Sequence, residues 1–321
     1  MKHIVFYAIL LACVTFAGCE LGNEDETVLE NYEAKDFIDE FSVVQKRTLN
    51  TSNLPDTVIT SKGSKFIIQP GTFTKNGNPI TGDFAVEIKE IHQRSEIIFN
   101  LTNTNHVSGK PLLSDGFFHI NATQNGENLD KTLANPVRVE MKTNTDRGYS
   151  QLWQAAGEAG NDDDSFAWEQ EQDGTDNKQN FLEGQGVFMF DIGKLGWFNC
   201  DIYWEDTAPK TTVTVNIGGM TGSIASLLQD KGGLYVFFCA KGDNVVAQFY
   251  SKSGPNSIKS YDDSMPIGKE GKIFVVMFHK GKFYYGMLNI TISADMSVTV
   301  NVSENTKDFI QQQIAALDNF N

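Results

Sequence analysis

Between Val58 and Val302 the chain consists of short apolar runs separated by turn residues. Phe84, Val86 and Ile88 alternate with polar neighbours, which is typical of a strand that buries one face. The runs 234–240 and 273–278 are continuously apolar, as in central strands covered on both faces. Turn signals recur roughly every 8–12 residues, a spacing typical of β-sandwiches. The strand–helix–strand alternation of nucleotide-binding folds and barrel enzymes is missing from the pattern.

This pattern predicts an all-β fold with two antiparallel β-sandwich domains. The predicted boundaries are residues 51–145 for the first sandwich, 146–206 for an acidic hairpin and bridging strand, and 207–302 for the second sandwich. Apolar residues at helical spacing predict a short helix within 28–46, inside an acidic tether segment 19–50. A second helix is expected within 303–321, with Ser303 as its N-cap.

Residues 1–18 resemble the signal peptide of a bacterial lipoprotein. Lys2 and His3 precede an apolar run from Ile4 to Ala17, which is shorter than the roughly 20 residues of a membrane-spanning helix. The run ends in small residues directly before Cys19, the pattern of precursors that are cut before a cysteine whose thiol carries the lipid. We predict diacylglycerol and acyl chains such as palmitate on Cys19. The alternative is a plain secretory signal with a chance cysteine.

The residues after Cys19 are strongly acidic, from Glu20 to Glu26. Such a run resembles the surface-export signal of Bacteroidota lipoproteins, and the alternative is a solvated tether. The whole chain has 41 Asp and Glu against 26 Lys and Arg, which argues against nucleic acid as a partner. We expect an outer-membrane lipoprotein displayed at the cell surface. Its partners would be the membrane, through the anchor, and a glycan or an outer-membrane protein.

Five short segments, in the right order along residues 30–310, resemble an uncharacterised family of Bacteroidota lipoproteins. They are residues 63–68, 70–73, 77–82, 112–118 and 195–201. The resemblance implies a ZU5-like amino-terminal sandwich and an immunoglobulin-like or transthyretin-like carboxy-terminal one, and it implies no activity. Self-cleaving ZU5-type domains need a hydroxyl nucleophile that the segment Phe118-His119-Ile120-Asn121 lacks, so that chemistry is not carried over.

Three weaker site predictions come from single residue types. Asp162, Asp163 and Asp164 could bind calcium through carboxylate oxygens, although their spacing fits no EF-hand and a solvated hairpin tip is the alternative. Cys200 and Cys239 could form a disulfide in an oxidising compartment, or stay free in the core. Trp153 and Trp168 are the candidates for stacking on a ligand, whereas Trp197 and Trp204 are expected to be structural.

The sequence offers no catalytic motif. Its histidines lack zinc-ligand spacing, and no nucleophile elbow, P-loop or Cys-x-x-Cys is present. We therefore predict a binding, adhesion or scaffold module without catalysis and without a cofactor other than the lipid on Cys19. The alternatives are a calcium-dependent hydrolase and an accessory subunit of an outer-membrane complex.

Overall fold

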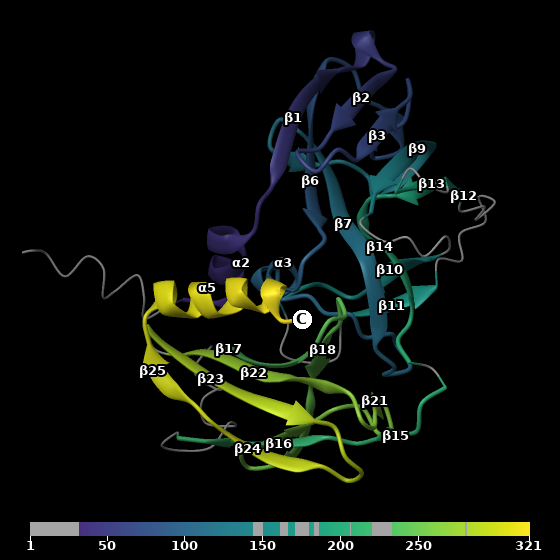
Figure 1. Ribbon diagram of the computed structural model, residues 1–321. Helices are drawn as coiled ribbons and strands as arrows, with labels where there is room; N and C mark the ends of the chain where they lie inside the picture. The colour runs from purple at the N-terminus through teal and green to yellow at the C-terminus, as the bar shows by residue number, and fades with distance from the viewer. Residues whose placement is uncertain are drawn as a thin grey trace, which may run out of the picture.

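A computed structural model describes residues 32–143, 150–160, 166–170, 180–182, 186–205, 207–219, 233–279 and 281–321. The fold is mainly β, with several antiparallel sheets and short helices near both ends, as the alternating pattern predicts. Two pairs of sheets lie one above the other in Figure 1, and three helices lie between them. None of the described helices combines the length and apolarity needed to cross a bilayer.

The first pair of sheets encloses the first core. Within the described residues, sheet A has the order β1-β6-β7-β14-β10-β11, and β8 pairs with β7. Its strands are β1 (Gln45–Asn50), β6 (Asp83–Ile91), β7 (Leu112–Gln124), β8 (Glu127–Asn128), β10 (Gln151–Ala156), β11 (Ala167–Gln170) and β14 (Gly196–Tyr203). Sheet B has the order β12-β13-β9-β3-β2, with β2 (Asp56–Ile59), β3 (Lys65–Ile68), β9 (Thr132–Lys142), β12 (Asn180–Leu182) and β13 (Val187–Lys194).

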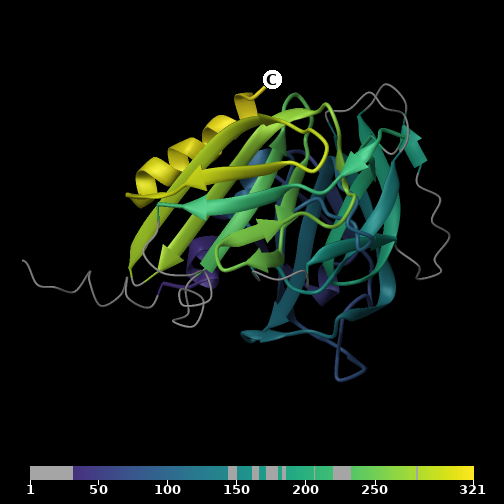
Figure 2. The ribbon, with the colours of Figure 1, turned by 90° about the horizontal axis from the view of Figure 1, so that it is seen from below.

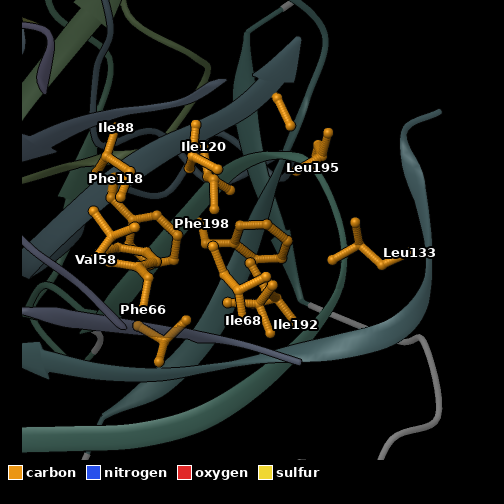
Figure 3. Packing of buried hydrophobic residues seen from close by; sticks show 14 of the residues in the cluster. Val58, Phe66, Ile68, Ile88, Phe118, Ile120, Leu133, Ile192, Leu195 and Phe198 are labelled. Atoms are coloured by element: carbon orange, nitrogen blue, oxygen red, sulfur yellow. The ribbon is translucent and has the colours of Figure 1, made fainter. Parts of the chain in front are cut away.

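Alternate residues of these strands form the first core. Val86 and Ile88 of β6 are fully buried, whereas their neighbours on the strand are partly exposed, which confirms the predicted half-buried strand. Aromatic rings fill the centre: the Phe118 ring lies 5.0 Å from that of Phe66 and 5.6 Å from that of Phe198, measured between centroids. Figure 3 shows these rings pointing toward one another from both sheets. Rings in such contact bury large apolar areas, which stabilises the pairing of the two sheets.

The described part of residues 146–206 contains the predicted hairpin, strands β10 and β11, and the predicted bridging strands, but all of them belong to the first pair of sheets. Strand β14 pairs with β7 in the middle of sheet A, and β13 pairs with β9 in sheet B. Strands β10 and β11 extend sheet A beyond β14. The physical reason is that this segment supplies apolar side chains, such as Phe188 and Phe198, that complete the first core. The predicted boundary at residue 145 therefore cuts through the first pair of sheets.

The second pair of sheets encloses a core of its own. In the described chain, sheet C has the order β19-β20-β16-β24 and sheet D the order β18-β17-β22-β23-β25. Sheet C contains β16 (Thr214–Gly218), β19 (Ser251–Gly254), β20 (Ser257–Lys259) and β24 (Ser297–Asn301). Sheet D contains β17 (Gly233–Ala240), β18 (Val246–Phe249), β22 (Glu270–His279), β23 (Lys282–Thr291) and β25 (Ser303–Asn305). Two separate two-stranded ribbons pair β4 (Thr74–Lys75) with β5 (Asn78–Pro79) and β15 (Lys210–Thr211) with β21 (Met265–Pro266).

Two details of the second pair differ from the sequence prediction. Strand β16 pairs with β24 in parallel, so sheet C is not purely antiparallel. The alternation of Val298 and Val300 predicts a strand but carries no information on the direction of its partner. Ser303 lies in β25, and the carboxy-terminal helix α5 (Lys307–Ala315) is instead capped by the Thr306 hydroxyl, which accepts from Phe309 N at 3.2 Å.

A third core joins the two pairs of sheets. Helices α2 (Ala34–Phe41) and α3 (Arg94–Phe99) and strands β10 and β11 contribute buried side chains from one side, including Phe37, Ile97 and Trp153. Sheet D and α5 contribute from the other side, including Tyr235, Phe274 and Ile314. Every residue of β17 is buried, because one face lies in the second pair's core and the other in this third core. Figures 1 and 2 show α5 beside the strands of sheet D.

Arg94, in the first turn of α3, bonds across this junction. Its Nε donates to Asp243 O at 2.9 Å, and its Nη1 donates to Phe320 O at 3.0 Å and to Leu317 O. The side chain comes from a helix in the first half of the chain, whereas all three acceptors belong to the second half. Because Arg94 is only 5% exposed, water does not replace these bonds if they are lost.

We expect Arg94→Met to lower the free energy of unfolding by about 2–4 kcal/mol, because it leaves three carbonyl groups at the junction without their donor. Urea denaturation followed by circular dichroism measures the change. The matched control is Arg138→Met, which removes only a surface pair with Asp191 at 3.4 Å and should cost less than about 0.5 kcal/mol. A loss under about 1 kcal/mol at Arg94 contradicts the role given to it.

Candidate functional site

Cys19 and the calcium candidates Asp162, Asp163 and Asp164 lie outside the described residues. Lipidation and calcium binding therefore stay predictions. In the part of the chain that the structure does describe, no group of three or more His, Cys, Asp or Glu side chains is arranged to hold a metal ion.

Trp153 and Trp168, the predicted stacking residues, are packed inside the third core. They are 1% and 0% exposed. The Trp153 indole N–H donates to Asp201 O at 3.0 Å, and that of Trp168 donates to Asn103 O at 2.7 Å. Their predicted role as exposed platforms is inconsistent with this burial, because neither ring has a free face for a sugar.

The two described cysteines are free thiols and form no disulfide. Cys200 lies in the first core and Cys239 in the third. Burial raises the pKa of the Cys239 thiol to about 12, and burial also raises that of Cys200. Both groups stay protonated at neutral pH, and their different cores explain why the predicted bridge is not formed.

A pocket of about 420 Å³ opens on the outer face of sheet A. Phe118, Ile120 and Phe198 point into the first core, so the residues that alternate with them face outward. The outward face is covered by the third core at one end and forms the pocket beyond it. The pocket is lined by His119, Ile120, Asn121, Asn128, Lys131, Gln154, Ala155, Gly157, Glu158, Lys194, Leu195, Gly196, Trp197 and Phe198.

Trp197 and His119 form the aromatic wall of this pocket. They are directly opposite each other on β14 and β7, and their ring centroids are 4.9 Å apart. The far side of the Trp197 ring is supported edge-on by Phe117 at 5.9 Å and Phe166 at 6.0 Å. Trp197 is thus held in place by the edge of the third core while remaining partly exposed.

Trp197 differs from the three other tryptophans in its hydrogen bonding. The indole N–H groups of Trp153 and Trp168 donate to backbone carbonyl oxygens, and that of Trp204 donates to Asp243 Oδ2 at 2.8 Å. Across the described residues, the indole N–H of Trp197 meets no protein acceptor. An amphipathic ring with an unused donor is a typical feature of an interaction surface.

His119 is a neutral imidazole in this setting. Its pKa is lowered to about 4, mainly by burial and in addition by the charges of Lys89 and Lys131. The charge of Glu87 acts in the opposite direction and contributes less. At pH 7 the ring therefore offers one donor nitrogen and one acceptor nitrogen. The charges that act on the His119 ring therefore disfavour its protonation on balance.

Amide side chains supply further hydrogen-bonding groups around the rings. Asn121 Nδ2 donates to Asn128 Oδ1 at 3.0 Å, and Gln154 Nε2 donates to Glu169 Oε1 at 3.2 Å. The Gln154 Oε1 atom is buried and has no hydrogen-bond partner among the described residues. At the rim, Lys131 and Glu158 are 3.6 Å apart and largely exposed. Convergent polar groups beside an aromatic ring are suited to binding a small polar ligand.

A second group of polar side chains is buried where β6, β7 and β14 approach the second pair of sheets. His92 Nε2 lies 2.7 Å from Glu90 Oε1, and Asn199 Nδ2 donates to Asp201 Oδ2 at 2.5 Å. Burial, together with the charge of Asp115, raises the pKa of Asp201 well above its ordinary value. None of these residues lines the pocket. The carboxyl groups with shifted pKa values are therefore packed against other side chains, outside the pocket.

A serine and a histidine also lie in contact at the surface, but their geometry differs from that of a catalytic serine–histidine pair. Ser108 Oγ lies 2.7 Å from His106 Nδ1, but the Ser108 backbone N–H donates to the same nitrogen at 3.1 Å. The other ring nitrogen faces the Tyr203 hydroxyl at 3.3 Å instead of a carboxylate. Nucleophilic catalysis would need an acid that orients the histidine through its second nitrogen, and a tyrosine hydroxyl lies there instead. We therefore interpret the contact as one that closes a local turn.

No protein-family model matches the chain, and no curated protein matches it.

Sequence reasoning did not find this pocket. The sequence predicts a structural role for Trp197, and it offers His119 neither zinc-ligand spacing nor the hydroxyl nucleophile of a self-cleavage motif. The available signal was the alternation of Trp197 and His119 with core residues Phe198 and Phe118, which places both rings on the outer face of their strands. That signal does not reveal that β14 pairs with β7 in the register that brings the two rings together.

We expect Asp201→Asn to stabilise the protein at neutral pH by about 1–3 kcal/mol. Below about pH 4 the wild-type carboxyl is protonated in both the folded and the unfolded chain. As the pH rises, the unfolded chain loses this proton while the folded chain keeps it, so the wild type loses stability and the variant does not. Urea denaturation at pH 4, 6 and 8 should show a difference that grows with pH.

The control for this series is Asp191→Asn, an exposed carboxylate 3.4 Å from Arg138, which should give a difference of less than about 0.5 kcal/mol at every pH. A variant of Asp201 that is less stable than the wild type at pH 8 would mean that the buried group is ionised.

Proposed function

We propose that this protein is a lipid-anchored binding protein of the cell envelope, displayed at the outer-membrane surface and acting without catalysis. Its ligand would be a saccharide that occupies the pocket on sheet A. The observation that carries this proposal is Trp197, a partly exposed ring fixed at the pocket wall with an unused indole N–H. Sugar rings present C–H groups to an aromatic face and hydroxyl groups to neighbouring donors and acceptors, and Trp197, His119 and Asn121 offer both.

The arrangement of titratable groups favours binding over hydrolysis. Hydrolysis of a glycoside needs two carboxyl groups on either side of the scissile bond. Among the described residues that line the pocket, Glu158 is the only carboxylate, and it lies at the exposed rim beside Lys131. The strongly perturbed carboxyl group of Asp201 is packed away from the pocket. The pocket therefore has the groups to hold a sugar and lacks a paired acid and base.

We also propose that the two pairs of sheets are two β-sandwich domains, ZU5-like in the first half and immunoglobulin-like or transthyretin-like in the second. Each pair encloses a core of its own, which supports this interpretation. The third core and Arg94 then make the two domains a single rigid head, which the segment behind Cys19 would hold at the membrane.

We expect Trp197→Ala to weaken glycan binding about tenfold or more, because it removes both the stacking face and the indole donor. A glycan array probed with the wild-type protein identifies a ligand, and calorimetry then compares the variants. Trp197→Phe keeps an aromatic face and should lose less affinity. Thermal melts check that both variants fold. An array with no bound glycan, or an unchanged affinity in Trp197→Ala, contradicts the proposed function.

We expect Cys19→Ala to abolish fatty-acid labelling of the protein in cells and to release it from the membrane fraction. Acyl chains contribute about 0.8 kcal/mol per buried CH₂, so their loss removes the anchor. Metabolic labelling with an alkyne-tagged palmitate and detergent phase separation measure the two effects. A Cys19→Ala protein that still partitions with the detergent phase would overturn the assignment of the anchor.

A further inference from the structure

Lys89 is not among the residues that line the pocket, but it continues the row of Trp197 and His119 onto a third strand. In the register of sheet A, His119 on β7 is opposite Trp197 on β14 and opposite Lys89 on β6. The three side chains therefore lie on the same outer face, at successive strands. Strands are about 4.8 Å apart, so the row from ring to ammonium spans about 10 Å, close to the length of a disaccharide.

Lys89 is a cation without a counter-ion. It is partly buried, and across the described residues it forms no ion pair and no hydrogen bond. The nearest carboxylates that act on it are Asp39 of α2 and Glu87 of β6. Asp39 is already paired with Lys35, and Glu87 is paired with Lys46 at 2.7 Å. A half-buried ammonium normally gains a partner, since its desolvation is otherwise unfavourable.

Lysines outnumber carboxylates among the described residues that line the pocket. These are Lys131 and Lys194, against Glu158. This local excess of lysine is opposite to the composition of the chain, which carries a formal charge of −15. A positive pocket on an acidic protein attracts an anionic ligand while the surrounding surface repels it elsewhere, so the charge contributes to specificity.

We propose that the row Trp197–His119–Lys89 binds an acidic saccharide, with a sugar ring on Trp197 and the carboxylate of a uronic acid residue on Lys89. This inference rests on the proposed function, because it names the ligand class of the same pocket. The neutral His119 ring between them donates to or accepts from a hydroxyl group of the sugar. Lys131 at the rim adds attraction that is screened by salt.

The test compares an array of uronic-acid oligosaccharides with their carboxyl-reduced counterparts, in which each carboxylate is replaced by a neutral alcohol. We expect at least one acid to bind the wild type about tenfold more tightly than its reduced partner. Lys89→Met should reduce this ratio to within about twofold, and Lys89→Arg should preserve most of it. Trp197→Ala should weaken both members of the pair.

Two controls separate charge recognition from folding. Lys65→Met removes a lysine of sheet B that pairs with Glu140 at 2.8 Å, outside the pocket, and should leave the ratio unchanged. Lys89→Met should not lower the melting temperature, because it replaces an uncompensated charge with an apolar side chain of similar length.

The outcomes distinguish this inference from the proposed function. If acids and their reduced partners bind equally and Trp197→Ala weakens both, the acidic ligand is wrong while the saccharide site stands. The inference also fails if Lys89→Met leaves the ratio unchanged. If no glycan of either kind binds, the proposed function fails together with it.

Discussion

The hydrogen bonds of the Arg94 guanidinium to three backbone carbonyls hold the two halves of this protein in one arrangement. They cross a core of aromatic and aliphatic side chains that belongs to neither pair of sheets alone. That third core also supports the pocket: Phe117 and Phe166, which hold the Trp197 ring, are members of it. The position of the pocket wall on sheet A thus depends on the docking of sheet D and its helix, although no residue of sheet D lines the pocket.

Hydrogen bonding separates structural from exposed groups in this fold. The indole N–H groups of Trp153, Trp168 and Trp204 each donate to a protein acceptor. Within the described residues, Trp197 differs in having an indole N–H without an acceptor, and Lys89 differs in having no ion-pair partner. Because leaving such groups unpaired is unfavourable, their occurrence on one face of one sheet supports the proposal of a ligand site there.

The sequence predicted the features that depend on local patterns. The alternation around Val86 gave the strand, and helical spacing around Phe37 gave α2. The features that depend on distant partners were not predicted: the parallel pairing of β24, the entry of β13 and β14 into the first pair of sheets, and the burial of Trp153 and Trp168. A periodic pattern predicts that one face of a strand or helix is buried, but it does not predict which other element covers that face. The candidate site required the register of β6, β7 and β14, which no local pattern encodes.

Chemical modification of the two described cysteines can detect transient opening of the cores that enclose them. Cys200 is enclosed by the first core and Cys239 by the third, and both thiols are inert while they are buried. An alkylating reagent in solution reacts with each only when its own enclosure opens transiently. The relative rates of modification at the two positions therefore rank the local openings of the first core and of the third core. The two native cysteines thus allow the first core and the third core to be compared for the ease of local unfolding.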